Sequence, residues 1–471
     1  MKTPFLGTAY VSRSRDLSLE QCINLYPEIV ETKQGAQVGA FYGTPGLDLL
    51  ATVGNGPIRG MLTFNGNLYV VSGTGVYIVT SNFNVSLLGN IATGSGQVSM
   101  IANATQVALF DGIGGYSIVN GALNSITLPF SNPGLAVYQD GFGVVSQNGT
   151  SNIWQSSIND LTSWPALNYG VENGKLSNIV GIGELHRQIY VFKERGTFVW
   201  VNAGLSPFAF QRLDGVSLEI GCIAANSIAN VGDNLLWLSQ NDQGQGVVYL
   251  ANGYQPERVS THGMEYATAQ YPTLTDAIAY AYQQEGHYFY QITFPSGNET
   301  WVLDLTATRQ LGYPAWHKRL AFSNGNFSRH QTATCQFFAG KVVVGDYNAG
   351  KLYAYNLNTY TDAGQRRKWL RSWRALPQTT SNAFRISWLE IQAETGGIST
   401  VDNPQMMLRQ TFDSSSYTSE FFQPVGLIGA TAQRIKFNRL GIERRGLSQD
   451  RVFELSSSDP YKVALLAAEI G

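Results

Sequence analysis

The feature that most constrains the fold of this chain is a pattern of short apolar runs joined by glycine-containing turns, repeated along most of its length. The pattern is complete in residues 179–200, where the apolar runs 179–182, 189–192 and 197–200 are separated by polar turns. Val, Ile, Tyr, Phe and Trp favour extended backbone, and Gly196 is suited to a hairpin turn with positive φ. This stretch therefore predicts a β-meander of the kind that forms one propeller blade.

Similar strand clusters follow one another between about residues 50 and 360, with starts about 30 to 55 residues apart. A repeat of about 40 to 50 residues with about four strands per unit is typical of a β-propeller. A single β-sandwich is the competing all-β architecture, but it does not need seven similar units in series. We therefore expect about seven blades, give or take one. The clusters are 65–81, 105–121, 135–157, 188–204, 233–253, 287–305 and 340–357.

The innermost strand of each blade is packed on both faces, so it should alternate less regularly between apolar and polar residues. Short apolar runs of this kind precede several of the hairpins. We expect innermost strands at 57–62, 97–102, 179–182 and 226–229.

Composition supports an all-β class, because 50 glycines and 12% aromatic residues accompany only 14% charged residues. The 31 Lys and Arg against 33 Asp and Glu give a net charge of −2, which leaves no overall electrostatic signature for nucleic acid or anionic membrane. No run approaches the roughly 18 apolar residues of a membrane span, so we expect no membrane insertion. The three widely spaced cysteines predict reduced, buried thiols in a protein made in a reducing cytoplasm.

Three parts are expected along the chain: an extended N-terminal arm (1–45), the propeller (46–363) and a smaller β-sandwich-like domain (364–471). The arm has no sustained hydrophobic period, apart from a possible helical turn at 17–23. It cannot build a core by itself, so we expect it to dock on another chain.

A basic and aromatic segment, GQRRKWLRSWRAL, begins the C-terminal domain. We favour a strand over a helix for it. We also favour a solvated strand edge protected by its charges, or a protein interface, over a nucleic-acid site, since Arg and Trp are enriched at interfaces and one basic patch is weak support for DNA binding. The candidate interface residues are Arg366, Arg367, Lys368, Trp369, Arg371, Trp373 and Arg374, together with Asn24, Leu25, Tyr26 and Pro27 of the arm.

No pattern of catalytic or metal-ligating residues stands out. The five histidines show no HExxH or HxH spacing, and GxSxG and Walker A motifs are absent. We expect no catalytic residue, metal or cofactor. Degenerate Asp-box turns at 157–164 and 411–417 are better explained by local hydrogen bonding. A glycan-binding or glycan-cleaving propeller stays as the alternative, and cleavage needs two carboxylates about 5 to 10 Å apart.

Several motifs together resemble one family, the packaged-DNA stabilisation proteins, or tail hub proteins (tail accessory factors), of short-tailed bacteriophages. The resemblance rests most on SNIWQSSINDLTSWPALNYG (151–170) leading into IVGIGELHRQIYVF (179–192). The other motifs are INLYP (23–27), TPGL (44–47), WLEI (388–391) followed by Gly396 and Gly397, and IKFNRLGIERRG near the end.

The resemblance implies a structural virion protein of the phage tail, made in the bacterial host cytoplasm. It implies a homo-oligomeric ring, with six copies as the expected number, below the portal and the head-to-tail adaptor. Such a ring narrows or closes the channel near the packaged DNA. By the same resemblance, it receives a tail needle or plug and holds tailspikes or fibres, and no catalytic residue accompanies it.

Overall fold

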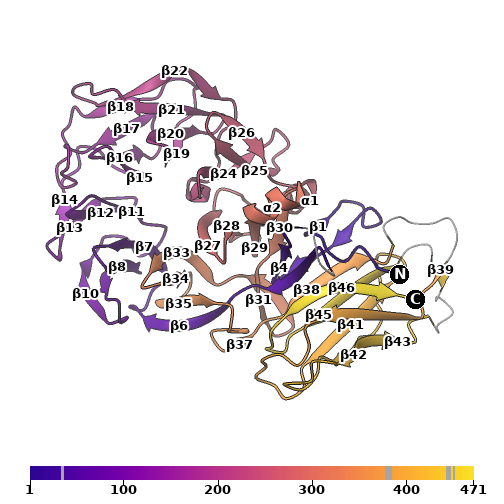
Figure 1. Ribbon diagram of the computed structural model, residues 1–471. Helices are drawn as coiled ribbons and strands as arrows, with labels where there is room; N and C mark the ends of the chain where they lie inside the picture. The colour runs from indigo at the N-terminus through magenta and orange to yellow at the C-terminus, as the bar shows by residue number, and fades with distance from the viewer. Residues whose placement is uncertain (33–36, 377–383, 442–446, 449–450) are drawn as a thin grey trace.

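The computed structural model describes residues 1–32, 37–376, 384–441, 447–448 and 451–471, and it is almost entirely β (Figure 1). Strands make up 53% of the chain and helix 4%. None of the helices in these ranges is long and apolar enough to span a membrane. The all-β prediction is therefore confirmed.

Five blades are complete four-stranded antiparallel meanders, each in sequence order from the propeller axis outwards. Blade 1 contains β7 (Ile58–Phe64), β8 (Asn67–Ser72), β9 (Gly75–Val79) and β10 (Val85–Asn90). Blade 2 contains β11 (Ser99–Ala102), β12 (Gln106–Phe110), β13 (Gly115–Val119) and β14 (Ala122–Ile126). Blade 3 contains β15 (Pro133–Gln139), β16 (Phe142–Gln147), β17 (Asn152–Gln155) and β18 (Tyr169–Val171). Blade 4 contains β19 (Ile179–Leu185), β20 (Gln188–Lys193), β21 (Gly196–Asn202) and β22 (Phe210–Leu218). Blade 5 contains β23 (Ala229–Val231), β24 (Asn234–Gln240), β25 (Gly246–Asn252) and β26 (Gln255–Arg258).

Blade 4 shows how local sequence sets the turns. Residues 179–200 form its first three strands, as predicted, but the positive φ falls on His186 (51°) and Arg187 (59°), between β19 and β20. Gly196 instead begins β21. A two-residue turn with two left-handed residues matches the twist of the strands that it joins.

Blade 7 is closed by a strand from the start of the chain. It contains β33 (Thr332–Phe338), β34 (Lys341–Asp346) and β35 (Lys351–Asn356), and its fourth strand is β6 (Gly46–Thr52), which is antiparallel to β35. The short strands β36 (Thr361–Asp362) and β37 (Gln365–Arg366) continue this sheet. The propeller therefore has seven blades, and its first and last segments are hydrogen-bonded in one blade.

Blade 6 continues into the C-terminal domain. Its strands β27 (Ile278–Gln284), β28 (His287–Phe294), β29 (Glu299–Asp304) and β30 (Ala315–Lys318) are the first four of a nine-stranded sheet. The next is the N-terminal strand β3 (Cys22–Ile23), followed by β38 (Trp369–Arg374), β45 (Val452–Ser457), β41 (Gln405–Thr411) and β42 (Phe421–Pro424).

A second, five-stranded sheet packs on the C-terminal half of this sheet to form the sandwich. Its order is β4 (Leu25–Ile29), β5 (Gly39–Gly43), β46 (Ala464–Ile470), β40 (Trp388–Ala393) and β43 (Ile435–Asn438). The predicted sandwich is thus present, but two of its strands come from the N-terminal segment. The boundary expected at 363/364 falls in the turn between β36 and β37.

The remaining elements are short. They are β1 (Tyr10–Val11), β2 (Leu19–Glu20), β31 (Leu320–Ser323), β32 (Asn326–Arg329), β39 (Phe384–Arg385), β44 (Leu447–Ser448), the 3-10 helix η1 (Ala225–Ser227), α1 (His262–Thr268) and α2 (Leu305–Leu311).

Two expectations for the N-terminal segment need correction. The helical turn expected at 17–23 is wrong, because β2 and β3 occupy most of that stretch. The expectation that the arm docks on another chain also fails for its described residues, since β3 lies between β30 and β38, and β4 and β5 belong to the sandwich of the same chain. The apolar residues of the arm are therefore buried against other parts of the same chain.

The strand predicted for the basic and aromatic segment is confirmed as β38. Trp369 and Trp373 belong to the main hydrophobic core, whereas Leu370 belongs to a separate cluster with Ile23 and Leu320. Consecutive side chains of a strand point to opposite faces, which explains the alternation.

We predict that Trp373→Ala destabilises the fold by about 3 to 5 kcal/mol, the usual cost of a large aromatic cavity. Trp373 is fully buried, stacks edge-on with Phe5 at 4.8 Å between ring centroids, and donates from its indole nitrogen to Thr3 Oγ1 at 2.9 Å. Denaturant unfolding measures the change. Phe337→Ala removes an exposed ring and should leave stability within about 0.5 kcal/mol. Equal effects of the two substitutions would contradict this core.

Candidate functional site

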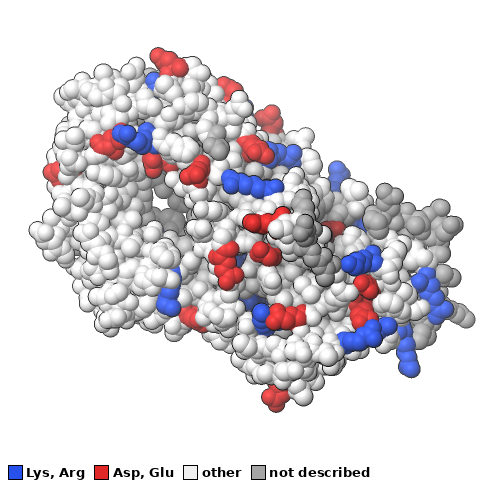
Figure 2. All heavy atoms as spheres, in the orientation of Figure 1, with Lys and Arg blue, Asp and Glu red and all other residues white. Residues whose placement is uncertain are grey.

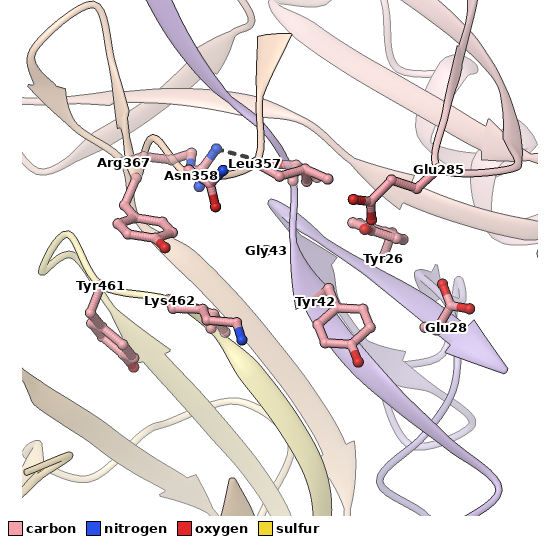
Figure 3. Close-up of a pocket in the computed structure, with 13 residues that line it drawn as sticks. Tyr26, Glu28, Tyr42, Gly43, Glu285, Leu357, Asn358, Arg367, Tyr461 and Lys462 are labelled. Carbon is pink, nitrogen blue, oxygen red and sulfur yellow. Dashed lines mark hydrogen bonds between the residues drawn. The ribbon is translucent and has the colours of Figure 1, made fainter. Parts of the chain in front are cut away.

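The candidate site is a cavity of about 470 Å³ at the junction between the propeller and the sandwich (Figure 3). The N-terminal strands β4 and β5, the turn before β28, the segments after β35 and β37, and the segment before β46 all contribute to its wall. The lining residues are Tyr26, Glu28, Tyr42, Gly43, Thr44, Glu285, Leu357, Asn358, Tyr360, Arg367, Tyr461, Lys462 and Val463.

Charge is divided across this cavity. Figure 3 shows Glu28 and Glu285 at one side and Arg367 at the other, with Tyr42 and Lys462 between them. Lys462 also pairs with Glu394 outside the cavity at 2.9 Å. The cavity therefore presents acidic, basic and aromatic groups together, which suits the binding of a polar ligand or a polar segment of a protein.

His287 fixes the acidic side of the cavity. Its Nε2 lies 2.6 Å from Glu28 Oε2, and its Nδ1 lies 2.6 Å from Asp304 Oδ2. Burial alone would lower the pKa of His287, but hydrogen bonding and charge from the two carboxylates raise it to about 9. The imidazolium therefore joins strand β4 to blade 6. Asp304 also caps helix α2, because its Oδ1 accepts from the Ala307 amide at 2.9 Å.

Two buried arginines hold the turn that leads from the sandwich into blade 7. Arg319 Nη2 and Arg367 Nη1 both donate to the carbonyl oxygen of Pro45, at 2.7 and 2.8 Å. The Arg319 guanidinium lies 4.0 Å from the centroid of the Tyr355 ring, and Arg367 lies 4.0 Å from Asp362. Burial raises the pKa of Asp362, and the two arginines partly offset that effect.

The cavity is built for binding more than for proton transfer. Burial is the main cause of the raised pKa of Tyr26, Tyr360 and Tyr461, so their phenols stay neutral at physiological pH. Both nitrogens of His287 are already hydrogen-bonded to carboxylates. Within the described ranges, no group of three or more His, Cys, Asp and Glu is placed to hold a metal ion.

Most of the predicted interface residues lie at the internal seam between the propeller and the sandwich. Asn24 is fully buried; its Nδ2 donates to the carbonyls of Leu320 and Lys368, and its Oδ1 accepts from the Leu320 amide. Leu25, Tyr26 and Pro27 are buried beside it.

The same correction applies to most of the basic segment. Arg371 is fully buried and donates to the carbonyls of Phe5, Thr8 and Gln21. Trp369, Trp373 and Arg367 are also buried, whereas Lys368 and Arg374 are half-buried and Arg366 is exposed and pairs with Asp459. Buried side chains of this kind join two parts of one chain and are not presented to a second one. Of all the predicted residues, Tyr26 and Arg367 line the cavity.

No sequence pattern pointed to His287, Asp304 and Arg319 as a group. Glu28 and His287 are 259 residues apart, and Pro45 and Arg319 are 274 apart, so only the folded chain brings them together. The one usable signal was the TPGL turn, in which the Pro45 carbonyl accepts hydrogen bonds from both arginines.

A second cavity, of about 210 Å³, marks the axis of the propeller, where Figure 2 shows the surface hollowed. Its wall comes from the inner strands, and no Asp or Glu is among the lining residues. Arg59 is the cationic residue there, and its nitrogens donate to the carbonyls of Gly73, Thr93, Ser95 and Gly96. It is therefore committed to structural hydrogen bonds.

The degenerate Asp-box turns are local structures, as favoured above. Asp160 accepts from the amide and the hydroxyl of Thr162, and Asp413 accepts from the amides of Ser415 and Ser416. These hydrogen bonds lower the pKa of Asp160 and Asp413. Both carboxylates thus satisfy nearby backbone groups.

A family model described as bacteriophage P22 Gp10, beta-propeller, matches residues 1–360. The chain belongs to this family. The match contains the N-terminal segment and all seven blades, and it ends before the C-terminal strands of the sandwich. The resemblance inferred from the sequence motifs is confirmed, and the protein is a phage β-propeller of the packaged-DNA stabilisation family.

Solved structures with a similar fold are distant in sequence. The Neurospora crassa Pan2 WD40 domain is 9% identical, covers 66% of this chain and 96% of its own, and has a TM-score of 0.43. A streptogramin B lyase is 10% identical, with 66% and 98% coverage and a TM-score of 0.45. BamB from Moraxella catarrhalis is 8% identical, with 74% and 98% coverage and a TM-score of 0.39. These likenesses concern the fold alone. No curated protein matches the chain.

We predict that the stability of the protein falls as pH rises through about 9, because His287 then loses its proton. Its folded pKa lies above the ordinary value of about 6.5, so its contribution is fully present below pH 6.5 and is lost above pH 9. The measurement is Tm against pH for the wild type and His287→Gln. The difference between them should be largest at pH 6 and shrink towards pH 10.

His186→Asn is the matched control, because His186 is an exposed turn residue with positive φ that Asn tolerates. Its Tm should follow the wild type at every pH. If the difference in Tm between the wild type and His287→Gln does not change with pH, the imidazolium does not link Glu28 to Asp304.

Proposed function

We propose that this protein is a non-enzymatic structural component of the phage virion: a hub in the tail, beneath the portal and the head-to-tail adaptor, that retains packaged DNA. The single observation that carries the proposal is membership of the bacteriophage P22 Gp10 family over residues 1–360. In this role, copies of the chain form a ring, with six as the expected number, that narrows or closes the exit channel. The ring also receives a tail needle or plug and holds tailspikes or fibres.

The chemistry of the propeller axis supports a channel between copies. Among the described residues that line the axial cavity, Arg59 is the one Lys or Arg. Arg59 at the axis is held by carbonyls and is not available to phosphates. DNA retention in this proposal therefore depends on the ring that several propellers form.

The continuous sheet from blade 6 into the sandwich supports a scaffold role. Nine strands join the two parts, and a strand of the N-terminal segment lies in the middle. A particle component that resists the pressure of packaged DNA needs parts that do not open independently, and a shared sheet favours joint unfolding.

The alternative function, glycan cleavage, requires two carboxylates about 5 to 10 Å apart in a pocket. The described residues that line the axial cavity include no such pair. A larger groove between blades 4 and 5 contains Glu194, Glu219 and Asp242, but Glu219 forms an ion pair with Lys175 at 2.7 Å. The junction cavity also contains Glu28 and Glu285, but Glu28 is hydrogen-bonded to His287 at 2.6 Å. We favour the structural role over hydrolysis because of the family membership.

We predict that particles made without this protein package a full genome and then lose it. The measurement is the ratio of filled to empty particles after purification, with protein-deficient particles complemented by wild-type protein as the control. The ratio should fall at least about tenfold without the protein and recover on complementation. Deficient particles that keep their genomes as well as the wild type does would contradict the retention role.

A further inference from the structure

We propose that copies of this chain associate head to tail, with an apolar tip of the sandwich docking on an apolar rim of blade 3 in a second copy. This inference rests on the proposed ring and deepens it by naming the two surfaces that meet. Neither surface is part of the junction cavity described above.

The first surface, called the rim here, lies on the outer edge of blade 3. It consists of Leu167, Tyr169, Val171 and Leu176, all exposed. Strand β18 is the outermost strand of blade 3, and within the described chain it pairs with β17 alone. An edge strand of this kind leaves one row of backbone groups free for another chain.

Leu167 lies exposed in the turn before β18. Within β18, Tyr169 and Val171 point to one face of the strand. Gly170, between them, packs inwards, because a Cβ there would lie 2.7 Å from the Phe208 ring. Strand β18 has three residues, and a short edge strand is one of the ways in which proteins limit pairing at an edge. Its exposed side chains are apolar or aromatic, and Leu176, five residues further along the chain, is also exposed.

The second surface, called the tip here, lies at one end of the sandwich. It consists of Ile398, Phe422, Leu427 and Ile428, each more than half exposed. Two loops meet there, since the Gly429 amide donates to the Gly396 carbonyl at 2.9 Å. Strand β42, which carries Phe422, is the last strand of the nine-stranded sheet; among the described residues it pairs with β41 alone and also contacts β43.

Position and charge point to a second copy as the occupant. Figure 1 shows β18 and β42 at opposite ends of the molecule, so the tip cannot reach the rim of its own chain. The propeller (46–363) has 13 Lys and Arg against 19 Asp and Glu, whereas the C-terminal part (364–471) has 14 against 10. The two parts of the chain therefore carry opposite net charges, −6 and +4. In Figure 2, Lys and Arg gather over the sandwich on the face shown.

Contact between two different patches on identical chains is heterologous, and such contacts close into rings when the rotation between copies allows it. Opposite charges favour the approach of the sandwich of one copy to the propeller of the next. The apolar patches then supply the buried centre of the contact.

The test uses the full-length chain and two double variants. The tip variant is Leu427→Asp with Ile428→Asp, and the rim variant is Leu167→Asp with Leu176→Asp; all four side chains are more than half exposed, so folding should be retained. Sedimentation velocity and native mass spectrometry over a concentration series measure assembly, and circular dichroism checks the fold. Leu87→Asp and Ile113→Asp, at exposed apolar positions of blades 1 and 2, are the matched controls.

We expect the wild type and both controls to form rings, and each double variant to need at least about tenfold more protein to associate. An equimolar mixture of the two double variants should form dimers and no larger species. The intact tip of the rim variant can dock on the intact rim of the tip variant, and the two surfaces left free in that dimer both carry substitutions.

Three results would overturn the proposal: a wild-type chain that stays monomeric, a tip or rim variant that assembles like the wild type, or a mixture that gives no dimer. A different occupant, such as a fibre protein, would appear as normal self-assembly of both variants. Genome retention is measured separately in particles, so failure of this contact and failure of the hub function give distinguishable results.

Discussion

The structure depends on one short segment, residues 22–52, which adds strands to three different sheets. Strand β3 lies between blade 6 and β38, β4 and β5 belong to the second sheet of the sandwich, and β6 closes blade 7. Each of these sheets otherwise consists of strands far away in the sequence. The segment therefore closes the propeller and attaches the sandwich at the same time, so neither part has a complete set of strands without it.

The polar contacts along this segment are buried and specific. Asn24 makes three hydrogen bonds to backbone groups of two other segments, and the Pro45 carbonyl accepts from two arginines. Losing one partner of a buried polar contact is costly, because the remaining group is left without water or a replacement. These contacts fix the position of the segment, while the packing of Phe5, Phe41 and Trp373 supplies the apolar core.

The blades could be predicted from the sequence because each blade is a local unit. Strand runs and turns recur every 40 to 50 residues or so, and the innermost strands expected at 57–62, 97–102 and 179–182 overlap β7, β11 and β19. At 226–229 the helix η1 occupies the first two residues of the run, and β23 begins at its last residue, Ala229. Strand β38 was also predictable, because alternation over 369–374 is a local signal.

The junction between the propeller and the sandwich was not predictable, because its contacts are not local in the sequence. Polar residues alternate with apolar ones in the N-terminal segment, and their partners lie about 260 to 370 residues away, so no local period reports their burial. Arg371 and Trp373 have the composition of an interface, and they do form one, but it lies between two parts of the same chain. Composition alone does not distinguish an interface within a chain from one between chains.

Hydrogen exchange of residues 19–29, followed by mass spectrometry on the full-length protein, tests this central role most directly. We expect amides of β3 and β4 to exchange as slowly as those of the inner blade strands, because they open only when the sheets separate. Complete exchange of this peptide within seconds, while the blades remain protected, would contradict the joining role of the segment. It would show that the segment behaves as a free arm.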